Sequence, residues 1–237
     1  MSKPITDRKP WAFLDSYRGT DFNGDWPTLP EMLRITVKRF GDRPCFTVFE
    51  SEKHTLTYNE VLANIEGLAA WLAAQGVKKG DRVAVSGKNS PEWATVYFAA
   101  LFAGAIIVPI DYALHENEIE NLLKASEPKV FFVDEERYEY FSSKGKTKAK
   151  PAVYSLSPKH KDTYVYGLKT DKAAKITPAE ENDTAAILFT SGTTGTPKGV
   201  MLSHKNLVSD CYIAQTNLEI FETDVFYALL PIHHSYT

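Results

Sequence analysis

Short apolar runs alternate along the chain with longer segments in which apolar residues recur at the spacing of one helix face. The short runs have the length and the β-branched content of buried strands, and the longer segments carry helix-favouring residues at their ends. We expect strands at residues 81–86, 105–110 and 129–133, and helices at residues 30–40, 57–76, 91–102 and 116–125. This alternation predicts an α/β fold class of layered, largely parallel sheets with flanking helices.

Polar and glycine residues mark the ends of the predicted helices. Thr57 followed by Glu60 has the spacing of a capping box, and Gly76 follows the end of the apolar face that this helix carries. Ser90 followed by Pro91 indicates another helix start, because proline at the first helical position needs no hydrogen-bond partner. We therefore assign folding roles to these residues.

Between residues 142 and 175 the alternation of apolar runs and helical segments is replaced by lysines and short runs of polar residues. We interpret this stretch as a solvated linker with a short strand near residues 153–156. It divides the chain into a first α/β subdomain at residues 1–180 and the start of a next subdomain at residues 181–237. The apolar pattern continues to the last residues, so we expect the fold to continue beyond residue 237.

Composition and charge narrow the classes of protein that need to be considered. A hydrophobic content of 43% is ample for a core, while a net charge of −3 favours neither nucleic acid nor an acidic membrane surface as the main partner. Cys45 and Cys211 stand far apart without metal-ligand spacing, which predicts free thiols. With no signal-peptide or membrane-helix pattern, we expect a cytoplasmic protein with at most peripheral membrane contact. The histidine spacings predict no structural metal.

A loop rich in hydroxyls and glycines follows an apolar run at residues 185–189, which we interpret as a buried strand. Backbone N–H groups at glycines, hydroxyl donors and a lysine together suit a cradle for phosphate groups. The loop is not a Walker A motif, because Pro197 precedes the lysine and Gly199 follows it. The candidate phosphate-binding residues are Thr190, Ser191, Gly192, Thr193, Thr194, Gly195, Thr196 and Lys198.

The sequence after the loop predicts a further strand at residues 199–202 and a helix that Ser203 caps and that extends to about residue 216. Ligands in α/β sheets usually bind where strands end at their carboxyl side. Asp111 and Asp134 also stand at predicted strand ends, but carboxylates there more often shape loops, so neither is included among the candidate site residues.

The order of residues in the loop resembles the phosphate-loop signature of the AMP-forming adenylating superfamily, which includes acyl-CoA synthetases, peptide-synthetase adenylation domains and luciferases. Four upstream segments are similar to patterns of the same family and occur in the same order, so the resemblance extends from about Trp26 to the end of the chain. These segments are residues 56–60, 76–83, 89–93 and 103–109.

The resemblance implies that the loop contacts the β- and γ-phosphates of ATP, with Lys198 on a flexible flap. It implies a role for His234 near the α-phosphate, since His234 follows Pro231 and Ile232 as the family motif requires. Without the resemblance, this histidine would be interpreted as a core residue.

The reaction so implied is ATP-dependent activation of a fatty acid, with Mg²⁺ required and coenzyme A as co-substrate. In relatives, the adenine, ribose and lysine contacts lie farther along the chain, so residues 1–237 would be an incomplete N-terminal domain, inactive alone. Aryl and amino-acid substrates remain open, as do a nucleotide-binding regulatory domain and a structural module in which the loop is a relic.

Overall fold

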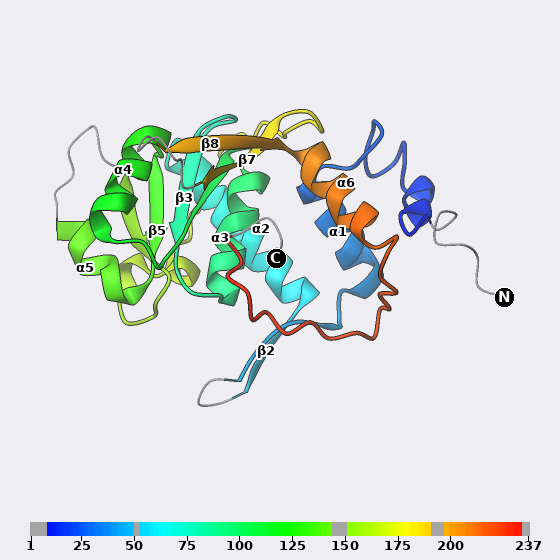
Figure 1. The fold of residues 1–237 in the computed structure, drawn as a ribbon, viewed down its shortest axis with the longest axis horizontal. Helices are drawn as coiled ribbons and strands as arrows, with labels where there is room; N and C mark the ends of the chain where they lie inside the picture. The colour runs from blue at the N-terminus through cyan, green and yellow to red at the C-terminus, as the bar shows by residue number, and fades with distance from the viewer. Residues whose placement is uncertain (1–8, 50–52, 144–150, 191–196, 234–237) are drawn as a thin grey trace.

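Six strands form a single sheet whose spatial order differs from the chain order (Figure 1). The strands lie in the order β6-β5-β3-β4-β7-β8, and neighbouring strands are parallel except β7 with β8. Their bounds are β3 Arg82–Ser86, β4 Ile106–Ile110, β5 Val130–Val133, β6 Ala152–Ser155, β7 Thr184–Thr190 and β8 Lys198–Ser203. The α/β fold class with a largely parallel sheet is confirmed. The structure is a computed structural model that describes residues 9–49, 53–143, 151–190 and 197–233.

The helices begin where the sequence provides side-chain caps. The predicted capping box of Thr57 and Glu60 forms, with the Thr57 hydroxyl accepting the N–H of Glu60. Ser90 and Ser203 likewise cap the helices that follow them, as predicted. The helices are α1 Leu29–Phe40, α2 Tyr58–Ala74, α3 Pro91–Phe102, α4 Glu116–Ser126, α5 Glu135–Ser143 and α6 His204–Ala214.

Side chains of the central strands alternate between two cores, one on each face of the sheet. Val83 and Val85 of β3 enter the larger core, which includes residues of α1, α2, α3 and α6. Ala84, between them, enters the smaller core with residues of α4 and α5. Burial on both faces explains why these strands are continuous apolar runs rather than alternating ones.

A separate hairpin and a short helical turn were not predicted from the sequence. Strands β1 Pro44–Val48 and β2 His54–Thr57 pair antiparallel, and the hairpin projects from the rest of the molecule (Figure 1). A 3-10 helix, Ala12–Ser16, precedes them. The side chains of β1 and β2 are half-buried or exposed, so they lack the apolar run that identifies the central strands.

The Lys-rich stretch is more structured between residues 152 and 168 than a linker would be. Its predicted short strand is confirmed as β6, which pairs in parallel with β5. Leu156 and Val165 are buried, and short 3-10 turns at Lys161–Thr163 and Val165–Gly167 follow the strand. The expectation of a solvated segment is therefore wrong here, because these few apolar residues complete the core. The predicted division near residue 180 stays a prediction; β7, beyond it, joins the same sheet as β4.

Both cysteines are free thiols, as predicted, with Cys45 half-buried and Cys211 at the surface. Among the helices in the described ranges, none combines the length and apolar character needed to cross a lipid bilayer.

Two glycines that follow helices allow a direct test of how closely the chain before β4 approaches the segment around residue 177. Gly76 and Gly104 both have positive φ, 86° and 76°. A Cβ at Gly76 would meet open space, whereas one at Gly104 would overlap the carbonyl oxygen of Thr177. We expect Gly76→Ala to lower the free energy of unfolding by about 1–2 kcal/mol through the left-handed backbone alone. Gly104→Ala should cost about 1–3 kcal/mol more, because the clash adds overpacking.

Urea unfolding of both variants measures this difference, and Gly76→Ala is the matched control for the backbone term. Equal losses in the two variants would contradict the close approach of residue 104 to the 177 carbonyl.

A buried histidine joins the starts of α1 and α6. The side chain of His204 is 1% exposed, and its Nδ1 accepts the N–H of Leu29 at 3.2 Å. Burial lowers the pKa of His204 to about 4, and the positive charge of Lys79 acts in the same direction, while Asp183 opposes it. Neutral His204 therefore satisfies one of the N–H groups that a helix start leaves unpaired.

The shifted pKa makes the stability of the fold depend on pH. Below pH 6.5 the unfolded chain protonates this histidine while the folded chain does not, so stability falls as the pH drops towards 4. The full loss is on the order of 3 kcal/mol. Unfolding in urea at pH 7.5 and pH 5 should show that His204→Gln loses much of this dependence, whereas His54→Gln, at an exposed position, retains it. An unchanged pH dependence in the first variant would contradict the assignment.

Candidate active site

The carboxyl ends of the parallel strands share one edge of the sheet, and the predicted phosphate loop begins there. Thr190 ends β7, and Lys198 begins β8 directly opposite it in the antiparallel pair. The two ends of the loop are thus neighbours, held by the ladder between β7 and β8. The loop itself, residues 191–196, lies outside the described residues.

The β7–β8 hairpin explains why a glycine follows the lysine. Gly199 pairs with Phe189, and a Cβ at this position would come within 2.8 Å of Cγ2 of Ile187. Lys198 itself is exposed at the start of β8. A small residue therefore lets β8 lie close to β7 while the neighbouring ammonium group stays accessible to a ligand.

Next to β7 at this edge, the loop that follows β4 meets the last described residues of the chain. Oδ1 of Asp111 lies 3.6 Å from Nε2 of His233, and the ring of Tyr112 stands edge-on to the imidazole at 6.4 Å between centroids. Oδ1 of Asp111 also accepts the N–H of Ala113 at 2.8 Å, which fixes the carboxylate. His233 is buried. An acidic group and a histidine are thus brought together from positions far apart in the sequence.

The segment that carries His233 is bound to the loop after β3. The Nδ2 group of Asn89 donates to the carbonyl oxygens of Ala228 at 2.9 Å and Leu230 at 2.8 Å. Its Oδ1 accepts the N–H of Ile232 at 3.0 Å. Figure 1 shows the chain returning from α6 across the molecule to reach this point. Residues 228–233 are called the C-terminal strap below.

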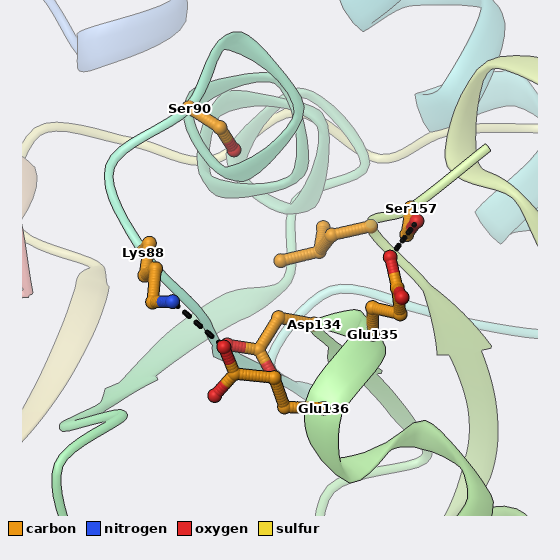
Figure 2. A pocket seen from close by; sticks show the side chains of 7 residues that line it. Lys88, Ser90, Asp134, Glu135, Glu136 and Ser157 are labelled. Carbon is orange, nitrogen blue, oxygen red and sulfur yellow. Dashed lines mark hydrogen bonds and ion pairs between the residues drawn. The ribbon is translucent and has the colours of Figure 1, made fainter. Parts of the chain in front are cut away.

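A polar cavity of about 280 Å³ opens at the same edge, beyond the ends of β3, β5 and β6. Figure 2 shows the ion pair of Lys88 with Glu136 at its rim and the hydrogen bond that the Ser157 hydroxyl donates to Glu135. Lys159 also donates to Glu135. The Lys88–Glu136 and Lys159–Glu135 pairs have N–O distances of 2.7 and 2.6 Å. The cavity is lined by Lys88, Ser90, Asp134, Glu135, Glu136, Leu156 and Ser157.

The carboxyl groups around this cavity differ in acidity. Burial raises the pKa of Asp134, and the neighbouring charge of Glu136 acts in the same direction. By contrast, the hydrogen bond from Lys88 lowers the pKa of Glu136, and the hydrogen bond from Lys159 lowers that of Glu135. With three carboxyl groups and one lysine at its wall, the cavity does not suit an anionic phosphate.

The structure locates two of the predicted site residues and leaves the others outside its described ranges. Thr190 and Lys198 lie opposite each other, as stated above. Ser191, Gly192, Thr193, Thr194, Gly195, Thr196 and His234 fall outside the described residues. No local pattern in the sequence signals the contacts of Asn89 with Ala228 or of Asp111 with His233, because each joins positions more than a hundred residues apart.

The described ranges contain no cluster of three or more His, Cys, Asp or Glu side chains that could hold a metal ion. We assign no step of a reaction to a metal bound by these residues.

A family model described as AMP-binding enzyme matches residues 33–237. Among curated proteins, a Bacillus subtilis protein named as an acyl-CoA ligase, YdaB, is 35% identical over 78% of this chain. The L-proline–[L-prolyl-carrier protein] ligase of Streptomyces coelicolor is 31% identical over 84% of it. Among solved structures, a fatty acid AMP ligase from Legionella pneumophila superposes with a TM-score of 0.74 over 89% of this chain, at 25% identity.

The chain spans 38% and 39% of the lengths of the two curated relatives and 36% of the Legionella chain. The family model nevertheless covers most of the chain, including the loop, the β7–β8 hairpin and the C-terminal strap. On this match, the chain belongs to the AMP-binding enzyme family.

Proposed function

We propose that the protein containing this chain activates a fatty acid, first to acyl-AMP and then to acyl-CoA. The observation that carries the proposal is the position of the loop. Its two ends, Thr190 and Lys198, are paired at the carboxyl edge of a parallel sheet, where ligands of α/β folds usually bind.

The proposed first step joins the acid to the α-phosphate of ATP. A carboxylate oxygen attacks the α-phosphorus, the bond from that phosphorus to the oxygen bridging to the β-phosphate breaks, and pyrophosphate leaves with the electron pair. Negative charge shifts to the leaving group, so hydroxyl and N–H donors that are already oriented lower the barrier. Thr193, Thr194 and the loop glycines would supply such donors, and Lys198 would supply a positive charge.

In the second step the sulfur of coenzyme A attacks the acyl carbon of acyl-AMP, and AMP leaves. Mg²⁺ bound with ATP would neutralise part of the triphosphate charge in the first step. Residues that contact adenine, ribose and coenzyme A are assigned to the parts of the family fold beyond this chain.

The choice of a fatty acid as the substrate rests on the loop, the strap and one structural neighbour. The resemblance of the loop and the strap to fatty-acid activating members favours a fatty acid, and one structural neighbour is named as a fatty acid AMP ligase. One relative is named as a proline ligase, so an amino acid is an alternative substrate. An aryl acid is a further alternative.

Steady-state pyrophosphate release by the full-length protein, with ATP and a panel of acids, tests the proposal. We expect turnover with medium- or long-chain fatty acids and much less with 4-coumarate or proline. A preference for proline or coumarate would contradict a fatty acid as the substrate and indicate an amino acid or an aryl acid instead. Tight ATP binding without pyrophosphate release for any acid would instead favour a non-catalytic nucleotide-binding domain.

A further inference from the structure

One side chain, that of Asn89, binds the backbone of the C-terminal strap at three points. The three hydrogen bonds of Asn89 occupy both of its amide hydrogens and its oxygen, and all three go to the strap backbone. Apolar packing contributes little along the strap before Ile232, since the side chains of Leu229 and Leu230 are 75% and 62% exposed.

Asn89 is itself firmly placed. It directly precedes Ser90, whose hydroxyl accepts the N–H of Trp93 at 3.1 Å and so caps α3. Trp93 is buried in the larger core. The carboxamide therefore projects from a fixed helix start, three residues beyond the end of β3 at the carboxyl edge.

His233 is the last residue of the strap, and it lies buried at this edge beside Asp111 and Tyr112. His234 is bonded directly to it, and consecutive Cα atoms are about 3.8 Å apart. Fixing the strap backbone up to Ile232 thus fixes the point at which the chain reaches the candidate catalytic histidine.

From these contacts we propose that Asn89 is a positioning residue for adenylate formation: its carboxamide sets the strap, and through it the backbone that carries His233, against the sheet edge at which the phosphate loop begins. The inference rests on the proposed function, because it needs the reaction for which His234 would be placed. It predicts that loss of the Asn89 contacts lowers the maximal rate without weakening ATP binding, because the loop anchored at Thr190 and Lys198 is unaffected.

Asn89→Asp in the full-length protein tests the contact with little change of shape. The new side chain keeps an acceptor for the Ile232 N–H but turns an oxygen towards the Ala228 and Leu230 carbonyls, where the amide donated. We expect kcat for pyrophosphate release to fall about 10-fold near pH 8, with an almost unchanged KM for ATP, because a misplaced group costs rate rather than binding.

Lowering the pH should partly restore the kcat of Asn89→Asp. Desolvation and the facing carbonyl oxygens raise the pKa of an introduced carboxyl group, and its protonated form can donate one hydrogen bond again. The ratio of wild-type to variant kcat should therefore shrink as the pH falls from 8 to about 6. Asn89→Ser removes the contacts without adding a charge, so its ratio should stay constant with pH. Asn217→Asp, at an exposed position, controls for the added charge.

Hydrogen–deuterium exchange of the full-length variants gives a second readout that does not depend on turnover. Peptides covering the strap should exchange faster in Asn89→Asp and Asn89→Ser than in the wild type, while peptides of β3 and β4 should not change.

The outcomes separate the two proposals. Wild-type turnover together with a kcat ratio near one for both Asn89 variants, in proteins that unfold at the wild-type temperature, would overturn the positioning role and leave the proposed function standing. A large ratio for Asn89→Asp with unchanged exchange of the strap peptides would also overturn it, because the strap would still be held as in the wild type. A wild-type protein that forms no adenylate would overturn the proposed function and the positioning role with it.

Discussion

Replacing Thr193 or Thr194 by alanine in the full-length protein should lower the rate of fatty-acid-dependent pyrophosphate release about 10²-fold, as does the loss of one donor in an oxyanion hole. The reason is the shift of negative charge onto pyrophosphate as it leaves. A hydroxyl in the loop between β7 and β8 would strengthen its hydrogen bond as that charge develops, so its removal affects the transition state more than bound ATP.

Steady-state kinetics at saturating fatty acid and ATP measure this effect in kcat. Thr177→Ala removes an exposed hydroxyl on the segment before β7 and should leave kcat unchanged. Thermal unfolding of each variant excludes misfolding. If both loop variants keep wild-type kinetics and wild-type folding, the loop does not have the role that we assign to it.

Lys198→Ala should act differently, raising the KM for ATP about 10- to 10²-fold while lowering kcat less. A lost hydrogen bond to a charged group costs roughly 1.5–3 kcal/mol, which corresponds to this range of affinity. The ammonium group is a flexible point charge at the exposed start of β8, so it should contact the triphosphate about equally before and during the reaction. Such uniform binding changes KM rather than kcat.

Lys198→Arg should retain much of the ATP affinity, because the charge is kept, and Lys172→Ala, at an exposed position in the Lys-rich stretch, serves as the control. A loss confined to kcat, with an unchanged KM for ATP, would instead show that Lys198 stabilises the transition state more than bound ATP.

Much of the fold could be predicted from the sequence because its signals are local. The capping box at Thr57, the Ser90–Pro91 start of α3 and the apolar runs of β3, β4 and β5 each depend on residues close together in the chain. Buried parallel strands are continuous apolar runs, which makes them easy to find. The hairpin of β1 and β2 was missed because its residues are not buried enough to produce such a run.

Non-local contacts explain what could not be predicted of the candidate site. The short strand β6 was predicted, but the Lys-rich composition concealed the packing of the residues after it, where Leu156 and Val165 are buried. The partners of Asn89 lie 139–143 positions away, and His233, which faces Asp111, is also far from it in the sequence. The phosphate loop, in contrast, is predicted by its order of residues and stays a prediction, and the structure adds the pairing of Thr190 with Lys198 across its ends.

The central claim is that this protein joins a fatty acid to the α-phosphate of ATP, and an oxygen-label transfer experiment tests it most directly. The full-length protein is incubated with ATP, coenzyme A and a fatty acid whose two carboxyl oxygens are labelled with a heavy isotope. The masses of the products are then measured by mass spectrometry. We predict that AMP, not ADP, is formed, and that its phosphate carries one heavy oxygen, because the attacking carboxylate oxygen stays on phosphorus when the acyl group leaves. Unlabelled AMP, or ADP as the nucleotide product, would contradict the account.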